Sequence, residues 1–316
     1  MEVNHMEEPE TRSGFVAIVG QPNVGKSTLM NHILGVKLAI ATNKPQTTRN
    51  RILGVKNYPG KGQIAFLDTP GIHSSKKRLN QALVRIAVDS LQEVDLVCHL
   101  VDVAHCASAF QKEGDALAGD EAMVLEALQG LENVPCILVL NKIDLLKDKS
   151  VLLPIIEQLT QKQAYAHVLP VSALQGDQVD SLVDVIFGEL PADFPMFPQD
   201  MITDQAERFI ASEFVREQVM VLTKKEIPYS VAVEIERFED VPRKDLIEVS
   251  AVIHVERDSQ KGIIIGSKGS RLKQIGVRAR AQMEQFFGKK VYLETFVRVQ
   301  QGWSEDPRSL HRFGYE

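Results

Sequence analysis

The sequence predicts two domains, an α/β domain built around a mostly parallel sheet and a smaller α+β domain after it. A chain of 316 residues has room for about two domains of ordinary size. In the first part, strand-like apolar runs alternate with helical patterns, which favours a doubly wound sheet with both faces covered. A proline-rich stretch then marks a boundary. We expect a disordered N-terminus at 1–13, a first domain at 14–190, a linker at 191–202 and a second domain at 203–316.

The composition is typical of a soluble globular protein, with 44% hydrophobic and 25% charged residues. No apolar run approaches the roughly 20 residues of a membrane-spanning helix. Residues 1–12 are acidic and polar, unlike a signal or transit peptide. The cysteines Cys98, Cys106 and Cys136 lack a C-x-x-C spacing and fit buried apolar positions better than metal-ligand positions. These features predict a cytoplasmic protein without a zinc site.

A phosphate-binding loop follows the first apolar run. The segment GQPNVGKST at 20–28 fits the pattern G-x-x-x-x-G-K-[ST] and lies between a strand-like run and a helical pattern. Its glycines let backbone N–H groups surround an anion, and the helix N-terminus adds partial positive charge. We expect Lys26 to reach the outer phosphates and the Ser27 hydroxyl to bind magnesium. The other expected contacts are Gly20, Pro22, Asn23, Val24, Gly25 and Thr28.

A second apolar run ends in the segment DTPG at 68–71. Open α/β sheets bind ligands at the carboxyl ends of their strands. Asp68 can therefore hold magnesium through water, and the Gly71 N–H can reach a terminal phosphate. The next strand-like run is followed by residues 105–119, which we expect to be an irregular loop.

The segment NKID at 141–144 predicts which base is bound. The Asp144 carboxylate can accept both N–H groups that guanine presents at N1 and its exocyclic amine, and adenine offers no such pair. We expect the Lys142 stem to pack over the base and Asn141 to brace the loops. A later strand places the backbone N–H groups of Ser172 and Ala173 where they can contact the guanine carbonyl. The predicted ligands are GTP and GDP, with Mg²⁺ as cofactor.

The ordered set GQPNVGKST, QTTR, DTPG, NKID and SAL resembles the translation-factor-related class of Ras-like P-loop GTPases up to about residue 190. This resemblance implies GTP hydrolysis and a switch, in which loops around Thr48 and Gly71 are ordered by the terminal phosphate and released on hydrolysis. It implies Ser27, Thr48 and Asp68 as magnesium ligands. It also implies a catalytic set of Asn23, Lys26, Thr48 and Gly71.

One position departs from the Ras pattern. The residue after Gly71 is Ile72 and not the glutamine that orients the attacking water in Ras. In a related subfamily, an asparagine of the phosphate loop helps to bind a potassium ion that supplies positive charge. Asn23 matches that position, so K⁺ is an additional candidate cofactor, and the alternative is that Asn23 merely suits a turn.

The second domain carries the segment GSKG at 266–269, between two predicted helices and after two predicted strands. The patterns place its strands at 229–236, 246–255 and 290–299 and its long helices at 204–222 and 270–287. Between residues 257 and 290, nine Lys and Arg are opposed only by Asp258 and Glu284, which indicates contact with a polyanion. This arrangement resembles a type II KH domain, which clamps about four single-stranded nucleotides on its GxxG backbone. The implied RNA contacts are Ile264 and Ile265 as an apolar groove wall, with Gly266, Ser267, Lys268, Gly269, Arg271 and Lys273.

A GTPase domain followed by a type II KH domain resembles the Era family of bacterial ribosome-assembly GTPases over nearly the whole chain. The resemblance implies binding near the 3′ end of small-subunit rRNA in the immature small subunit. For some members it implies peripheral contact with the inner face of the membrane. Residues 105–119 are longer than the family pattern, and we expect a monomer. Two alternatives stay open: a regulatory GTPase that acts through membrane or protein contacts with the KH-like domain as scaffold, and a passive RNA-binding module whose nucleotide site is structural.

Overall fold

The computed structural model describes residues 11–315, except 45, 116, 118, 132, 225–226 and 228–229. The chain divides into two compact units that alternate along the sequence. Val36–Asn50 and Ser75–Arg85, which the sequence places in the first domain, belong to the second unit together with the chain from Gln205 onward. The first unit contains the remainder, and the expected domain boundaries stay a prediction.

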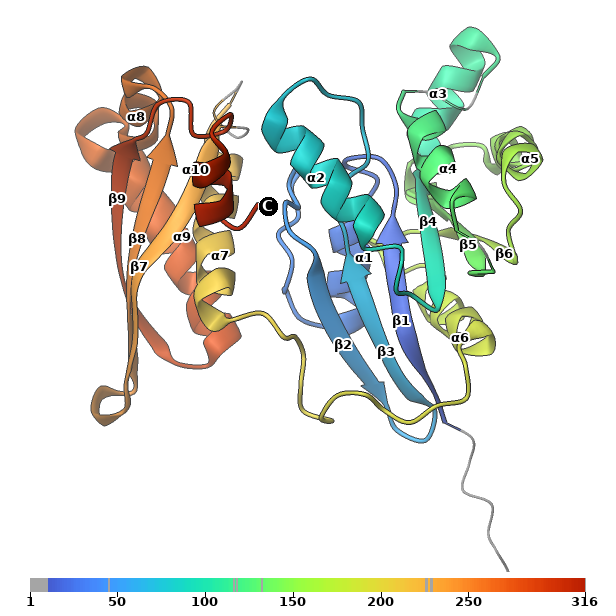
Figure 1. Ribbon diagram of the computed structural model, residues 1–316, viewed down its shortest axis with the longest axis horizontal. Coiled ribbons are helices and arrows are strands. Elements are labelled where there is room, and N and C mark those ends of the chain that lie inside the picture. Colours follow the sequence, from blue (N-terminus) through green and yellow to red (C-terminus); the bar gives the residue numbers. More distant parts are fainter. Residues whose placement is uncertain are drawn as a thin grey trace, which may run out of the picture. The chain divides into compact units, whose positions relative to one another are not determined.

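The described part of the first unit holds a six-stranded sheet in the order β2-β3-β1-β4-β5-β6 (Figure 1). β2 pairs antiparallel with β3, and the other neighbouring strands run parallel, which confirms the mostly parallel sheet. The apolar runs of β1, β3, β4 and β5 become buried strands because helices flank the sheet, whereas β6 at the edge is buried only at Val171. The strands are β1 (Arg12–Val19), β2 (Ile52–Tyr58), β3 (Gly62–Asp68), β4 (Leu96–Asp102), β5 (Cys136–Asn141) and β6 (His167–Val171).

Helices connect these strands, and two of them, α3 and α5, were not predicted. Residues 105–119, expected as an irregular loop, instead contribute most of a helix, α3, with 116 and 118 outside the described residues. The Asp102 carboxylate caps α3 by accepting from the N–H groups of Ala104 and His105, both at 3.1 Å. The helices are α1 (Lys26–Leu34), α2 (Arg78–Asp89), α3 (Val103–Glu113), α4 (Glu121–Gln129), α5 (Leu152–Lys162) and α6 (Val179–Glu189).

The ends of the first unit are more ordered than expected within the described residues. Arg12 and Ser13, assigned to a disordered N-terminus, are the first residues of β1, and residues 1–10 lie outside the described part. The predicted linker packs against the first unit. The Ile202 carbonyl accepts from Val55 N–H at 2.7 Å, and Phe197 packs edge-to-face on Phe15.

The second unit has a three-stranded sheet among its described residues, with β8 (Leu246–Val255) at the centre. β7 (Val231–Val241) runs antiparallel to β8, and β9 (Lys290–Val299) runs parallel to it. The predicted order of helices and strands is confirmed, although position 229, the expected start of the first strand, lies outside the described residues. The predicted helices are α7 (Glu207–Leu222), α8 (Asp258–Ile265) and α9 (Ser270–Phe287).

A short helix near the C-terminus, α10 (Pro307–Arg312), was not predicted. The Asp306 carboxylate caps it by accepting from Ser309 N–H at 2.9 Å. Leu310 then packs with the fully buried Trp303 and with Leu79, a residue of the second unit by its contacts. This packing explains why α10 forms despite its few apolar residues.

Candidate nucleotide and RNA sites

The phosphate loop joins β1 to α1, and its backbone requires glycine at two positions. Gly25 caps α1 with φ of 107°, and a Cβ there would lie 2.3 Å from the side-chain nitrogen of Asn141. A Cβ at Gly20 would lie 2.2 Å from the carbonyl oxygen of Leu100 in β4. Only residues without a side chain let the loop approach its neighbours this closely. Val24 is buried within the loop, and Thr28 lies in the first turn of α1.

Lys26 is held against the loop that precedes it. Its ammonium donates to the carbonyls of Gly20 at 3.2 Å and Gln21 at 2.9 Å. Burial lowers the pKa of Lys26 to about 8, while the negative charges of Asp68 and Glu121 oppose that decrease. The side chain is therefore mostly a cation at neutral pH, as contact with phosphates requires.

Two of the three predicted magnesium ligands lie together. The Ser27 hydroxyl donates to Asp68 Oδ2 at 2.6 Å, and both side chains are buried. A hydroxyl beside a carboxylate is an oxygen donor set that suits Mg²⁺. Thr48 is buried in the second unit, so its role as a third ligand stays a prediction.

The segment after β3 touches the phosphate loop directly. A Cβ at Gly71 would lie 2.6 Å from the backbone nitrogen of Pro22, so glycine is needed here as well. The Ile72 N–H donates to the Gly20 carbonyl at 3.2 Å, and the Ile72 side chain is buried. The position that carries a glutamine in Ras is therefore part of the core, and it offers no amide to a water molecule.

The segment NKID is connected to the phosphate loop from the other side. Asn141 donates to the Val24 carbonyl at 2.7 Å and accepts from Ala173 N–H at 2.9 Å, which is the predicted bracing. The Lys142 ammonium donates to the Asn23 carbonyl at 2.7 Å and to Asp102 Oδ2 at 2.5 Å. These bonds hold the Lys142 stem across this end of the sheet.

The exposed Asp144 carboxylate is oriented by Ser172, whose hydroxyl donates to Asp144 Oδ1 at 2.6 Å. The predicted use of backbone N–H groups differs from the structure. Ser172 N–H donates to the Asp177 carbonyl at 3.0 Å, and Ala173 N–H donates to Asn141. Neither therefore faces a base carbonyl in this arrangement, and Ser172 contributes its hydroxyl instead.

Asp102 was missed as a site residue. It pairs in register with Asn141, bonds Lys142 and caps α3. The signal was present in the sequence, because Asp102 ends an apolar strand as Asp68 does, and the carboxyl ends of neighbouring parallel strands meet at one edge.

The GSKG segment of the second unit forms a tight turn before α9. Gly266 has φ of 71° and Gly269 has φ of 77°, and Lys268 also lies in the left-handed region at 48°. A Cβ at Gly266 would lie 2.9 Å from Cβ of Arg271, whose guanidinium donates to the Ile263 carbonyl. The side chains of Ser267, Lys268 and Lys273 are exposed. The turn thus offers backbone and positive charge to solvent, as a phosphate clamp requires.

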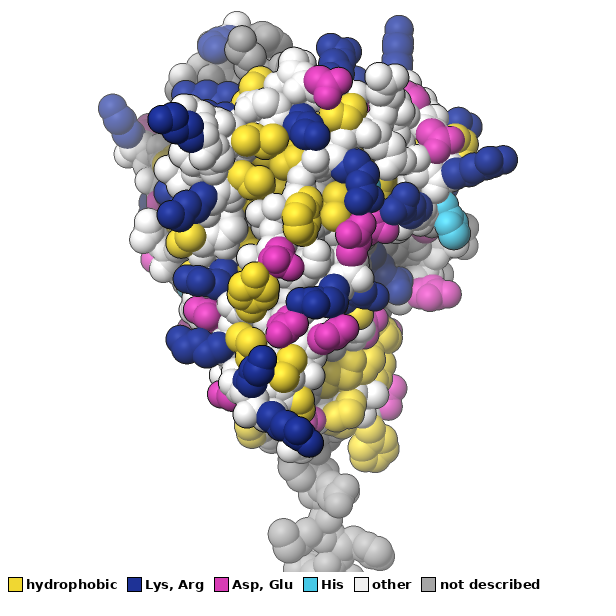
Figure 2. All heavy atoms as spheres, turned by 90° about the vertical axis from the view of Figure 1, so that its left-hand side faces the viewer, with side chains coloured by type: hydrophobic (Ala, Val, Ile, Leu, Met, Phe, Trp, Pro, Cys, Tyr) yellow, Lys and Arg dark blue, Asp and Glu magenta, His cyan; other side chains and the backbone are white. Residues whose placement is uncertain are grey.

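The predicted groove wall needs correction by one residue. Ile264 has no exposed surface, so it belongs to the core and cannot touch a base, whereas Ile265 is half-buried. Ile263, which was not predicted, is 43% exposed. Figure 2 shows this side of the molecule, where apolar side chains lie among many Lys and Arg. The exposed large apolar residues of α9 and β9 are Val277, Tyr292 and Phe296.

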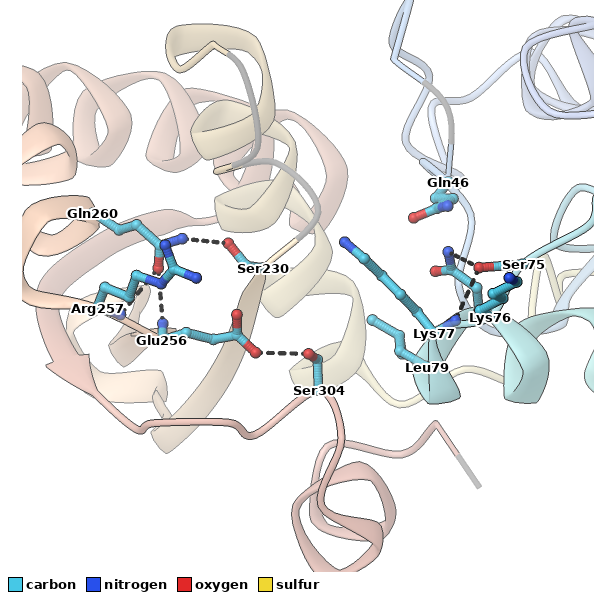
Figure 3. Close-up of a pocket in the computed structure, with 11 residues that line it drawn as sticks. Gln46, Ser75, Lys76, Lys77, Leu79, Ser230, Glu256, Arg257, Gln260 and Ser304 are labelled. Atoms are coloured by element: carbon cyan, nitrogen blue, oxygen red, sulfur yellow. Dashed lines mark hydrogen bonds between the residues drawn. The ribbon is translucent and has the colours of Figure 1, made fainter.

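The second unit also contains a pocket of about 570 Å³ whose lining residues are mostly of polar types (Figure 3). Its wall includes Lys76, Lys77 and Arg257, together with Glu256, which accepts from the Ser304 hydroxyl at 2.6 Å. The lining residues, all in the described part of the chain, include none of the predicted contacts.

Comparisons with known proteins find a match for each of the two predicted domains. A family model described as a 50S ribosome-binding GTPase matches residues 15–142, and a KH-domain model matches residues 226–304. GTPase Era of Geotalea uraniireducens (strain Rf4) is 50% identical, covering 98% of this chain and 100% of the relative. GTPase Era of Syntrophus aciditrophicus (strain SB) is 46% identical, covering 96% of this chain and 95% of the relative.

Two solved structures are similar over 96% of this chain and 99% of their own, each with a TM-score of 0.88. One is a variant of Aquifex aeolicus Era bound to GDP and AlF4⁻, which is 42% identical. The other is Era in complex with MgGDPNP and nucleotides 1506–1542 of 16S ribosomal RNA, which is 41% identical. This chain therefore belongs to the GTPase Era family, whose members join a GTP-hydrolysing domain to a C-terminal KH domain.

Proposed function

We propose that this chain hydrolyses GTP and binds the 3′-terminal region of 16S rRNA through its GSKG turn during assembly of the small ribosomal subunit. The observation that carries the proposal is full-length similarity to an Era structure that holds nucleotides 1506–1542 of that RNA. The exposed, positively charged turn at 266–269 supports the same contact from this chain's own residues.

Within the nucleotide site we assign roles residue by residue. Lys26 contacts the outer phosphates, and Asp144 recognises guanine after Ser172 has oriented it. Ser27, Asp68 and Thr48 hold Mg²⁺, which neutralises charge that develops on the phosphates. The Gly71 N–H, adjacent to Pro22, faces the terminal phosphate.

Contacts inside the second unit support a switch. Val36–Asn50, which contains Thr48, packs with the unit that carries the GSKG turn. The buried Arg216 of α7 donates to the Thr47 carbonyl at 2.5 Å, and Glu217 accepts from Ala41 N–H at 3.2 Å. A segment held by α7 in one state and by GTP and Mg²⁺ in another links nucleotide to the presentation of the KH domain.

The RNA contact is tested by filter binding of single-stranded RNA with the sequence of the 16S 3′ end. We expect Lys268→Glu to weaken binding at least about tenfold, because it places a negative charge where a phosphate approaches. Lys244→Glu, an equal charge change between β7 and β8, serves as the control and should have a small effect. If both variants lost the same RNA affinity, binding would depend on the net charge of the domain and not on a contact at the GSKG turn. Binding of the protein to anionic vesicles, measured in parallel, tests peripheral membrane contact. Among the described residues, every helix is too short or too polar to span a bilayer.

We propose that Asn23 helps to bind a potassium ion, which supplies positive charge near the phosphates. Ile72 has no side-chain amide with which to orient the attacking water, so the site needs another catalytic device. Asn23 is exposed in the loop with φ of 66°, and its carbonyl is held by Lys142. We expect GTP turnover to be faster in KCl than in NaCl at equal ionic strength, and Asn23→Ala to remove the difference. Equal turnover of the parent protein in both salts would leave Asn23 with a turn-forming role alone.

A further inference from the structure

A chain of four polar side chains begins at Gln21 of the phosphate loop, and its other three residues lie outside every motif described above. Glu121, the first residue of α4, is 1% exposed and accepts from Gln21 Nε2 at 2.6 Å. Its other oxygen lies 2.7 Å from Nε2 of His99, which belongs to β4 and has no exposed surface. Nδ1 of His99 lies 2.8 Å from the Tyr165 hydroxyl. All four residues belong to the first unit.

A carboxylate buried this deeply is costly unless each oxygen has a partner. Burial by itself raises the pKa of Glu121, but contacts with His99 and Gln21 and the charge of Lys26 bring it below its ordinary value. Burial also raises the pKa of Tyr165, so its hydroxyl keeps its proton. His99 thus lies between the two groups, with its Nδ1 2.8 Å from the Tyr165 hydroxyl and its Nε2 2.7 Å from Glu121. One oxygen of Glu121 is therefore bonded by Gln21, and the other lies against the His99 ring.

Gln21 connects this chain of side chains to the reactive end of the loop. Its backbone carbonyl accepts from the Lys26 ammonium at 2.9 Å. Its side-chain amide is held by the bond from Nε2 to Glu121, and its Oε1 points toward Gly119, where a Cβ would lie 3.1 Å away. Because the Gln21 side chain is held by Glu121, the position of the Gln21 carbonyl is restricted as well. The Lys26 ammonium, which donates to that carbonyl, is restricted with it.

We propose that Glu121 is a positioning residue of the nucleotide site, which acts through Gln21 to fix the start of the phosphate loop and orient Lys26 toward the outer phosphates. His99 and Tyr165 hold Glu121 in turn. This role rests on the proposed GTP site and adds to it a residue that touches neither nucleotide nor metal. It predicts that these four side chains affect binding of the outer phosphates and do not affect binding of the base.

The test compares GDP with GMP, since GMP lacks the phosphates that Lys26 contacts. We expect Glu121→Gln to raise the Kd of GDP about tenfold, the usual effect of losing one hydrogen bond to a charged group, and to leave the Kd of GMP within about twofold. The matched control is Glu189→Gln, because Glu189 lies 2.8 Å from His167 in an exposed pair of the same kind. The control should bind both nucleotides as the parent does.

A second variant, Gln21→Leu, tests the bond between Gln21 and Glu121. We expect this variant to fold, because Gln21 is only partly buried. Gln21→Leu should reproduce the selective loss of GDP affinity, and the double variant should be no worse than the more affected single variant. Equal losses for GDP and GMP, unchanged GDP binding in Gln21→Leu, or additive effects would overturn the proposal. Failure of the parent protein to bind GDP would instead remove the proposed GTP site.

Discussion

At the scale of single residues, the nucleotide site is held together by side chains that bond the backbone of another loop. Asn141 joins the phosphate loop to the loop after β6, and Lys142 joins it to the end of β4. The sequence predicted that Asn141 braces the loops, because that task leaves few choices of side chain, and the packing of Lys142 over a base stays a prediction. It failed to tell which isoleucine of α8 is exposed. Ile263 and Ile264 are adjacent residues of the same type, and only their positions around the helix axis decide which one faces the core.

The lowered pKa of Lys26 gives the site a defined pH dependence. Bound phosphates favour the charged ammonium, so they raise the pKa of Lys26 from its value of about 8 in the free protein. Below that pH the side chain is already protonated, and this group adds no pH dependence to binding. Above it, binding must take up a proton, so GDP affinity should fall by up to about tenfold per pH unit. Titrations from about pH 7 to about pH 9 check this, and a constant affinity would contradict it.

At the scale of elements, the predictions succeeded where apolar periodicity was strong. β8, α9 and β9 have the predicted bounds. α3 was missed because its polar and small residues gave no clear stripe. It forms because Asp102 caps it and because Val103 and Cys106 join a core with Ile155 of α5. Such support comes from residues distant in sequence, which local patterns cannot reveal.

Two helix caps separate stability from function. Asp102 and Asp306 both cap a helix, but Asp102 also bonds Lys142. We expect Asp102→Ala to lower the free energy of unfolding by about 1 kcal/mol and to weaken GDP binding as well. Asp306→Ala should shift the melting temperature and leave GDP affinity unchanged. Thermal melts and GDP titrations of both variants decide the matter: if the two lose GDP affinity equally, the Asp102–Lys142 bond has no functional role.

At the scale of the whole molecule, the two units exchange short segments along the chain, and this was not predictable. Patterns of strands and helices assign Val36–Asn50 to the domain whose strands surround it in sequence. Its packing is instead set by buried charged groups such as Arg216 and Arg49, which donate to backbone carbonyls at Thr47 and Val231. A segment that contains a predicted magnesium ligand therefore packs within the unit that carries the GSKG turn.

The most direct test of this connection is the affinity for RNA of the 16S 3′ sequence, measured with GDP and with a non-hydrolysable GTP analogue. We predict different affinities in the two states, and we predict that Arg216→Met, which removes the bond to Thr47, reduces the difference. Lys268→Glu should weaken binding in both states. Equal RNA affinities of the parent protein with GDP and with the GTP analogue would contradict the claim that nucleotide controls the RNA contact.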